Sequence, residues 1–307
     1  MVYIIVVNYK SWTDTRDCLY SLLDSSYNDW QVIVVDNSSN DSSLLKIKKS
    51  LSSHESITQE KIPIYTLSSE ITDCKSKIIL YQSSENLGFA GANNLIIEQL
   101  LNKEGYIWML NPDMIVEEDT LNHLYTCASV RNENNTVWGI TIKSFINRKK
   151  IEIIGGGKVN ALSGTVTMIK DYDSVEELDY INGSSLFTSI ETFRKVGLFN
   201  EEYFLYWEET DWCFRAKKRN ISFKVCTDAY GYDKGATSIG RGFLSDYYYG
   251  RNSLIFLNRH FSNFHIISAL SISVIRVIYR FITGKRDRVK GLLFGVTDYL
   301  KGKHGKR

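Results

Sequence analysis

The pattern of apolar and polar positions in the first half of the chain alternates between short strand-like runs and longer segments with helical spacing. The predicted strands are YIIVVNY, WQVIVVDNSS, KIILYQS and YIWML, each rich in buried-type residues and ending in polar ones. The predicted helices are TDTRDCLYSLLDSS, with Thr13 or Asp14 as its N-cap, then GFAGANNLIIEQLL and EEDTLNHLYTCAS. This order predicts an α/β fold with a mostly parallel central sheet flanked by helices.

Two aspartates lie just past the ends of predicted strands. Asp36 follows the second strand, and Asp113 follows the fourth in the sequence LNPD. The carboxyl ends of parallel strands meet at one edge of a sheet, where ligands bind. Pro112 fixes its own φ and favours an extended Asn111, so it directs Asp113. Geometry alone leaves two interpretations of Asp113 equally open, a ligand-binding carboxylate or a cap of the following helix.

An acidic cluster lies within the aromatic-rich segment FNEEYFLYWEETDWCFRAKKRN, which begins at Phe199. Glu208, Glu209 and Asp211 fall within four residues there. Neighbouring aromatic rings remove water from carboxylates and raise their pKa, which suits a general base. The alternative is that the three acids only complement the dipole of a helix N-terminus, and that Asp211 pairs with Arg215.

Basic and acidic side chains follow this cluster in a polar loop and the segment after it. The loop DAYGYDKGATSIGRG carries Asp233, Lys234 and Arg241, and Arg251 follows a run of tyrosines. Basic side chains here are expected to hold a diphosphate group. The ordinary alternative for each is a solvated surface charge.

Composition and charge describe an ordinary globular chain with a basic end. Residues 276–307 contain ten Lys or Arg against two Asp, although the whole chain of 307 residues has a net charge of only +2. The apolar run FHIISALSISVIRVIYRFI at 264–282 is interrupted by Arg276 and Arg280, which favours an interfacial helix over a spanning one. The five cysteines lack CxxC spacing, and the first strand lacks a basic leader. We therefore expect free thiols, a reducing compartment and no secretory signal.

The motifs together resemble the inverting family 2 glycosyltransferases with a GT-A fold, and among them the bacterial rhamnosyltransferase-like enzymes. The matching segments are VVNYKS, VIVVDNSSNDSS, NLGFAGANN, LNPD and INGSSLFTSIETFRKVGLFNEEYFLYWEETDWCFR, in the order of the family. The resemblance implies one GT-A domain over residues 1–260, with a nucleotide-binding half at 1–115 and an acceptor-binding half at 116–260. Residues 50–77 form a polar insertion, and residues 261–307 a basic amphipathic helical region.

The resemblance also implies a role for each matching residue. Substrate-binding roles fall to Asn8, Tyr9 and Asp36 at the nucleobase, to Asn86, Gly88 and Asn93 beside the nucleotide, and to Asn111 at the ribose. Asp113 is implied as a ligand of Mg²⁺ or Mn²⁺. Glu209 stands where the family usually has a catalytic Asp, and Glu208 remains a rival for that role.

Two departures from the family pattern concern the chemistry. Glu209 is one methylene longer than the usual Asp, and Asp233 replaces a common His near the diphosphate. Because Asp is a hard-oxygen ligand, the metal site is expected to be altered and not lost.

The implied function is inverting transfer of a sugar, rhamnose among the candidates, from a nucleoside-diphosphate sugar to a lipid-linked saccharide in O-antigen or capsule synthesis. The donor is dTDP-rhamnose or a UDP-sugar, and the enzyme is cytoplasmic and peripheral at the inner face of the membrane. Packing on the domain or a homo-oligomer contact are the alternatives for residues 264–282.

Rival interpretations of the function are a catalytically degenerate sugar-nucleotide-binding scaffold and a nucleotidyltransferase. The second ranks low because NYKSWTDT lacks a glycine-rich phosphate loop, and the acidic core argues against nucleic-acid binding.

Overall fold

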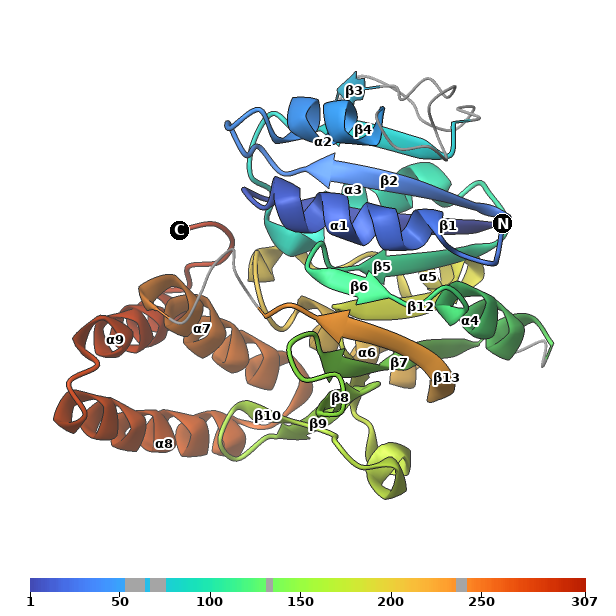
Figure 1. The fold of residues 1–307 in the computed structure, drawn as a ribbon. Coiled ribbons are helices and arrows are strands. Elements are labelled where there is room, and N and C mark those ends of the chain that lie inside the picture. Colours follow the sequence, from blue (N-terminus) through green and yellow to red (C-terminus); the bar gives the residue numbers. More distant parts are fainter. Residues whose placement is uncertain (53–63, 67–75, 131–134, 236–241) are drawn as a thin grey trace.

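The computed structural model describes residues 1–52, 64–66, 76–130, 135–235 and 242–307. Most of the predicted polar insertion at 50–77 therefore lies outside the described residues. The remainder forms three layers, with a long twisted sheet between two sets of helices (Figure 1).

The central sheet of the described residues has ten strands. Its first half is parallel, because β3, β4, β2, β1 and β5 pair in register in the same direction. Strand β12 then runs antiparallel between β5 and β7, and β13 pairs parallel to β7 and antiparallel to β6. Their bounds in sheet order are β3 Ile64–Thr66, β4 Ile78–Gln82, β2 Trp30–Asp36, β1 Val2–Asn8, β5 Tyr106–Leu110, β12 Ser185–Ser189, β7 Thr136–Ser144, β13 Ser222–Asp233 and β6 Met114–Val116, with β8 Ile151–Ile154 beside β7.

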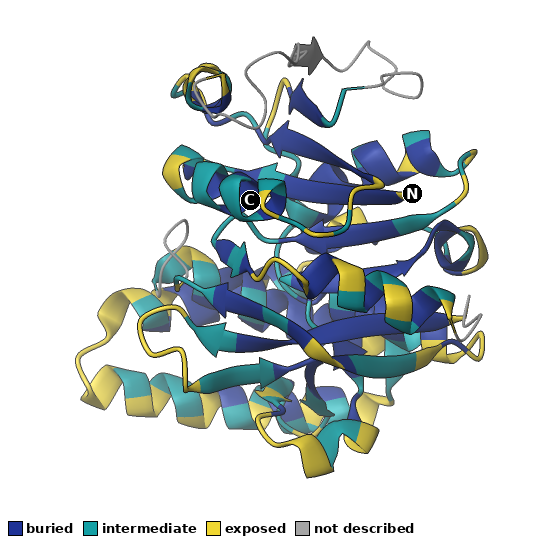
Figure 2. Ribbon diagram, turned by 45° about the vertical axis from the view of Figure 1, so that its right-hand side comes forward, coloured by how far each residue is buried: buried dark blue, intermediate teal, exposed yellow. Residues whose placement is uncertain are grey.

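Helices cover both faces of this sheet because its strands are apolar on both sides. Along β1, Ile4 and Val6 face one core, and Tyr3 and Ile5 face the other. The first core packs under α1 Trp12–Leu23, α2 Ser43–Leu51 and α4 Thr120–Ser129. The second packs under α3 Gly88–Leu100, α5 Ile190–Val196 and α6 Glu208–Lys217. Figure 2 shows the strands buried between them.

A second, smaller sheet and the C-terminal helices complete the molecule. The small sheet consists of β10 Thr165–Met168, β9 Gly156–Asn160 and β11 Tyr180–Ile181. Two short 3-10 helices are η2 Tyr172–Glu177 and η3 Glu201–Tyr203. The chain ends in α7 Phe243–His260, α8 Asn263–Ile282 and α9 Arg286–Leu300.

Helix α9 packs closely on α7 through two glycines. A Cβ at Gly291 would lie 2.4 Å from the Phe243 carbonyl oxygen, and one at Gly295 would lie 2.5 Å from that of Tyr247. By contrast, α8 is mostly exposed. Within the described part of the chain it is the one helix long and apolar enough, by length and composition alone, to cross a membrane.

Two expectations need correction, and one helix was not predicted. The first helix begins at Trp12, with Ser11 in the capping position, and neither Thr13 nor Asp14 caps it. Helix α2 was not predicted. Cys127 on α4 and Cys226 on β13 are paired as a disulfide, with Cα atoms 6.3 Å apart, so the expectation of free thiols is wrong for these two. The fold joins cysteines separated by 99 positions, a proximity that their spacing in sequence could not reveal.

Candidate active site

The carboxyl ends of β1 and β2 bring Asn8 and Asp36 together, as the parallel register pairs these two residues. The Asn8 amide nitrogen donates to Asp36 Oδ1 at 2.6 Å and to Ser39 Oγ at 3.1 Å. Asp36 Oδ2 also accepts from Gln82 Nε2 at 2.9 Å. Both Asn8 and Asp36 are buried, and Tyr9 beside them is partly exposed. The pair is thus fixed at the predicted edge, but contact of Asp36 with a nucleobase stays a prediction.

The segment from Asn86 to Asn93 lies where α3 begins. Asn86 Oδ1 accepts from Gly88 N at 2.9 Å. Gly88 has φ +73°, and a Cβ there would lie 2.1 Å from the Phe204 carbonyl oxygen. Asn93 is buried, and its amide donates to the Phe89 carbonyl at 2.9 Å. The structure therefore explains this glycine by close contact with the loop before α6, while contacts with a nucleotide stay predictions.

Asp113 and Asp233 meet at the junction of β6 and β13. The ladder pairs Asp233 with Met114, the residue after Asp113. Burial and the nearby Asp233 and Asp14 raise the pKa of Asp113 to about 6. Lys234 offsets little of this charge, because its ammonium group is held by Asp14 and Asp17.

This pair of carboxylates fits a divalent cation. Both are hard oxygen donors, and their mutual repulsion is relieved when a cation lies between them. In the described residues no group of three or more His, Cys, Asp or Glu is arranged to hold a metal. Any further ligands would come from a diphosphate or water. The alternative that Asp113 caps the next helix is wrong, because β6 intervenes and α4 begins only at Thr120.

A pocket of about 310 Å³ opens beside these strand ends. Asn111 belongs to its wall, and its backbone N–H donates to the Ser184 carbonyl at 2.9 Å, so the pocket adjoins the turn that carries Asp113. Aromatic rings, carboxylates and small polar residues share the wall. The lining residues are Phe89, Asn111, Val166, Met168, Tyr180, Asn182, Gly183, Ser184, Leu205, Tyr206, Trp207, Glu208, Glu209, Thr210 and Tyr249.

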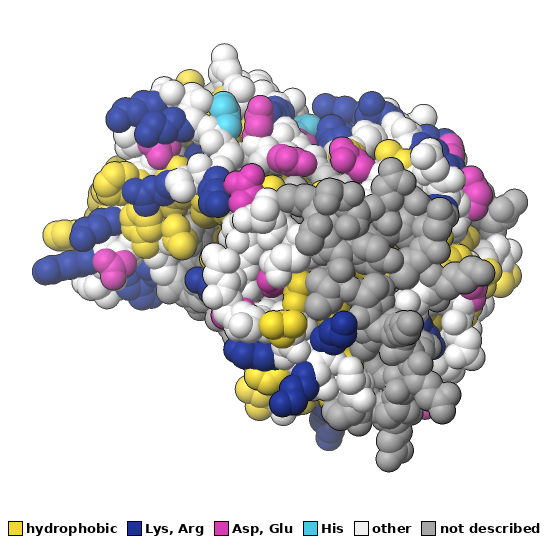
Figure 3. Space-filling model, turned by 90° about the horizontal axis from the view of Figure 1, so that it is seen from above, with side chains coloured by type: hydrophobic (Ala, Val, Ile, Leu, Met, Phe, Trp, Pro, Cys, Tyr) yellow, Lys and Arg dark blue, Asp and Glu magenta, His cyan; other side chains and the backbone are white. Residues whose placement is uncertain are grey.

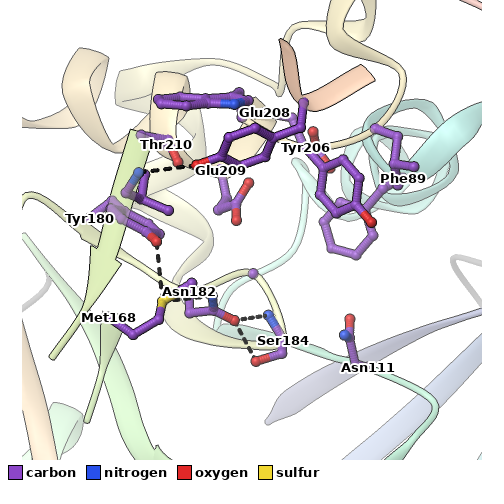
Figure 4. A pocket seen from close by; sticks show the side chains of 15 residues that line it. Phe89, Asn111, Met168, Tyr180, Asn182, Ser184, Tyr206, Glu208, Glu209 and Thr210 are labelled. Atoms are coloured by element: carbon purple, nitrogen blue, oxygen red, sulfur yellow. Dashed lines mark hydrogen bonds between the residues drawn. The ribbon is translucent and has the colours of Figure 1, made fainter. Parts of the chain in front are cut away.

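Glu209 is placed in this wall by the first turn of α6 and by a glycine opposite it. In Figure 4, Glu209 lies between Tyr180 and Tyr206 and faces Asn182 and Ser184 across the pocket. Gly183 contacts it closely, because a Cβ there would lie 3.4 Å from Glu209 Cγ. Burial raises the pKa of Glu209, although backbone N–H groups of Glu209, Gly183 and Thr210 oppose the rise.

Glu208 is more deeply buried than Glu209 and less well satisfied. Only 3% of it is exposed, and its Oε2 has no hydrogen-bond partner among the described residues. Burial, and then the charge of Glu209, raise the pKa of Glu208 well above its ordinary value. The stronger rise at Glu208 favours Glu209 as the candidate general base, and the role of each stays a prediction.

Asp211 has a structural environment. It accepts from the Tyr203 hydroxyl at 3.1 Å, pairs with Arg215 at 2.9 Å and lies 2.8 Å from His260 Nε2. Burial alone would raise its pKa, but the hydrogen bond from His260 and the charge of Arg215 outweigh this and hold the pKa below its ordinary value. Asp211 lies outside the pocket wall, so this placement does not support the expected catalytic role.

The loop that leads into α6 has several residues with positive φ, and side chains of α7 donate hydrogen bonds to its carbonyls. Phe204, Tyr206 and Trp207 have φ of 61°, 65° and 79°, which is costly for residues with side chains. The buried Asn252 amide donates to the carbonyls of Tyr203 at 2.6 Å, Leu205 at 2.7 Å and Tyr206 at 3.1 Å. The strain is therefore held by a residue of α7.

Arg251 supports the same loop. It is 1% exposed, its Nη2 reaches the Glu202 and Tyr203 carbonyls at 3.4 and 3.3 Å, and Tyr247 and Tyr248 lie beside it. This placement does not support the expected contact with a diphosphate. The sequence did not indicate Asn252 as a positioning residue, because it is one of several polar residues in the second half of α7.

Comparison with known proteins adds to this geometry. Residues 3–154 match the family described as "Glycosyl transferase family 2". Over 239 residues the chain is 28% identical to "Low-salt glycan biosynthesis hexosyltransferase Agl10" of Haloferax volcanii, a match that covers 73% of this chain. The chain spans only 64% of the length of that curated relative.

Solved structures share the fold at low sequence identity. One is S. aureus TarS 1–349 in complex with UDP-GlcNAc, with a TM-score of 0.58 and 14% identity over 98% of this chain and 80% of that one. Another is the mannosyltransferase PcManGT of Pyrobaculum calidifontis with GDP-Man and Mn²⁺, with a TM-score of 0.59 and 12% identity over 98% and 87%. The predicted fold class is confirmed. The chain thus has a GT-A fold, and its residues 3–154 are similar to glycosyl transferase family 2.

Proposed function

We propose that the protein is an inverting glycosyltransferase that moves a hexose from a nucleoside-diphosphate sugar to a saccharide acceptor. The observation that carries the proposal is a poorly solvated carboxylate, Glu209, in the wall of a pocket that adjoins the strand ends. A relative named as a hexosyltransferase in glycan biosynthesis supports the reaction class. Structural neighbours with bound UDP-GlcNAc or GDP-Man support the donor class.

In the proposed reaction, Glu209 accepts the proton of an acceptor hydroxyl as that oxygen attacks the anomeric carbon. The bond to the acceptor forms on the face opposite the diphosphate while the bond to the diphosphate breaks, so the anomeric configuration inverts in one step. Proton transfer of this kind contributes roughly 10²–10⁴-fold to a rate. The surrounding rings of Tyr180, Tyr206 and Tyr249 exclude water and supply flat surfaces for a sugar.

Asp113 and Asp233 would hold Mg²⁺ or Mn²⁺, which when bound supplies positive charge to offset the departing diphosphate. Their closeness and the raised pKa of Asp113 support this role. The proposed base of the donor nucleotide is a pyrimidine. The proposed sugar is narrowed to rhamnose, carried as dTDP-rhamnose, only by the motif resemblance.

The proposed acceptor is a lipid-linked saccharide in surface polysaccharide synthesis, used at the inner face of the cell membrane. The mixed aromatic and polar wall of the pocket supports a saccharide acceptor.

The testing experiment is calorimetric titration of dTDP, UDP, GDP and their sugar conjugates, each with and without Mn²⁺, followed by radiolabelled transfer to membrane extracts. We expect metal-dependent binding of one nucleotide, and transfer that Glu209→Gln abolishes while donor binding persists. Donor binding with no transfer to any acceptor would instead favour the catalytically degenerate sugar-nucleotide-binding scaffold.

A further inference from the structure

We infer that one face of α8 docks on the surface of an anionic lipid bilayer, and that the β9–β10 hairpin holds the acceptor pocket beside this contact. The role given to the pocket rests on the proposed function, whereas the docking itself does not. We define the outer face of α8 as seven apolar residues that recur at helical spacing: Phe264, Ile267, Val274, Ile275, Ile278, Phe281 and Ile282.

The outer face is apolar apart from Ser271. Each of its seven side chains is more than half exposed, and the exposed side of α8 is visible in Figure 2. Ser271 lies on the same face, but its hydroxyl donates to the Ile267 carbonyl at 2.9 Å and is satisfied within the helix. A contiguous apolar surface of this extent marks an interaction site.

The two arginines that interrupt the apolar run in sequence lie on the opposite side of the helix. Arg276 Nη2 donates to the Ser163 carbonyl at 3.1 Å, and Arg280 Nη2 pairs with Asp246 at 2.7 Å. The buried side of α8 also includes Ile266 and Ala269. Both charges thus fasten the helix to the domain and leave the outer face free of charge, which suits a helix lying flat in a bilayer surface.

Charge favours a lipid surface over a second copy of the chain as the occupant. Lys285, Arg286 and Lys290 follow α8 and are exposed, against one exposed acid, Asp287. Seen from above, on the side of α7 and α9 and away from the outer face of α8, hydrophobic side chains also gather between lysines and arginines at this end of the molecule (Figure 3). Anionic headgroups attract such cations, whereas a symmetric contact between two copies through this region would bring like charges together.

The β9–β10 hairpin links this face to the pocket. Val166 and Met168 of β10 line the pocket. The tip of the same hairpin is held on α8, since Ser163 accepts from Arg276 and a Cβ at Gly164 would lie 3.4 Å from that of Ala269. A bilayer against α8 therefore lies one hairpin away from the pocket, which fits an acceptor carried on a lipid.

The first test is co-sedimentation of the full chain with vesicles of phosphatidylcholine alone or mixed with phosphatidylglycerol. We expect binding to the anionic vesicles, and at least about a tenfold loss of partitioning for Ile275→Glu/Ile278→Glu, because charge on the lipid side of a helix is costly. The matched control is Leu45→Glu/Val130→Glu, which makes the same kind of change at exposed apolar positions of α2 and beside α4. Equal partitioning of the two double variants overturns the inference.

The second test places an environment-sensitive fluorophore at Ile278→Cys or, as a control, at Leu45→Cys, both in a Cys74→Ser background. Cys18 and Cys213 are buried, and Cys127 is paired with Cys226, so labelling is confined to the chosen site. We expect a blue shift at position 278 alone when anionic vesicles are added.

Three results would overturn the inference: no shift at 278, a vesicle-free oligomer by light scattering that Ile275→Glu/Ile278→Glu dissolves, or resistance to alkaline extraction. The oligomer would show that the outer face of α8 contacts another copy of the chain. Resistance to alkaline extraction would show that α8 spans the membrane. Because neither test uses a sugar donor, loss of transfer with intact docking would refute the proposed function and leave docking standing.

Discussion

At the scale of single residues, three neighbouring acids lie in three different environments. Glu209 lies in a pocket wall, Glu208 is buried with an oxygen that has no partner among the described residues, and Asp211 is paired with Arg215 and contacts His260. The sequence predicted the cluster and its desolvation. It could not separate the three, because the residues that decide between them, Gly183 and His260, are distant in the chain and are brought together by folding.

We predict that Glu209→Gln lowers kcat by roughly 10²–10⁴-fold with little effect on donor binding, since it removes the base. Glu208→Gln should keep most activity, because glutamine mimics the protonated acid that we assign there. Steady-state kinetics and donor titration of both variants provide the measurement. The opposite ranking of the two variants would move the base to Glu208.

A pH profile follows from the direction of these pKa shifts. Burial raises the pKa of Glu209 above the ordinary glutamate value of 4.5. The base therefore becomes protonated, and kcat falls, at a higher pH than it would for an ordinary glutamate. Activity is thus retained above the raised pKa and lost as pH falls through it. The measurement is kcat against pH, and an acid limb at or below 4.5 would contradict a desolvated base.

We predict that Asp113→Ala removes the metal-dependent part of donor binding, because it takes away one of the two neighbouring carboxylates. Asp113→Asn, which keeps the shape of the side chain, should behave in the same way if charge is the cause. Calorimetric donor titration with and without Mn²⁺ is the measurement, and unchanged metal dependence in both variants would argue that Asp113 is not a ligand.

At the scale of elements, the loop before α6 shows how one segment of chain is held in a costly conformation. Its three residues with positive φ are supported by Asn252 of α7. The apolar runs did predict β1, β2, β4 and β5, because those strands are buried on both faces. The strands β10, β11 and β12 escaped prediction, because runs of two to five residues carry no clear period even where they are buried. Helix α2 was hidden by its polar start.

We predict that Asn252→Ala lowers kcat at least about tenfold and also lowers stability, because it leaves the loop carbonyls without their buried donor. Ser253→Ala is the matched control, since Ser253 is buried on the same helix but bonds only within it, to the Gly250 carbonyl at 2.9 Å. Kinetics and urea unfolding separate the two effects. Full activity of Asn252→Ala would show that the loop holds its shape unaided.

At the scale of the whole molecule, the C-terminal helices are part of the folded unit. Helix α7 holds the loop of the candidate site, and α9 packs on α7 through Gly291 and Gly295. The charge pattern of the sequence predicted a basic, amphipathic helical region here, and C-terminal helices are present. It could not show that α9 is joined so closely to the domain, because that contact depends on glycines facing a backbone.

We predict that Gly295→Val lowers the free energy of unfolding by about 1–3 kcal/mol, because the new side chain meets the backbone of α7. Gly242→Ala is the control, as no atom lies within 4 Å of a Cβ there. Urea unfolding of both variants is the measurement. Equal midpoints would mean that α9 can separate from α7 without loss.

The inward pairing of Arg276 and Arg280 also has a consequence for the chain before it folds. Before folding, segment 264–282 is not yet packed beside Asp246 and the Ser163 carbonyl, so both arginines count against insertion. An arginine costs about 2.5–3.5 kcal/mol near the centre of a spanning helix, and Arg280 costs less than Arg276 because it lies two residues from the end of α8. We therefore expect the same two side chains that fasten α8 to the domain to disfavour insertion of the unfolded segment across a membrane. Replacing both arginines by leucine would remove this barrier to insertion during synthesis. The substitutions would leave the residues of the outer face of the folded helix unchanged.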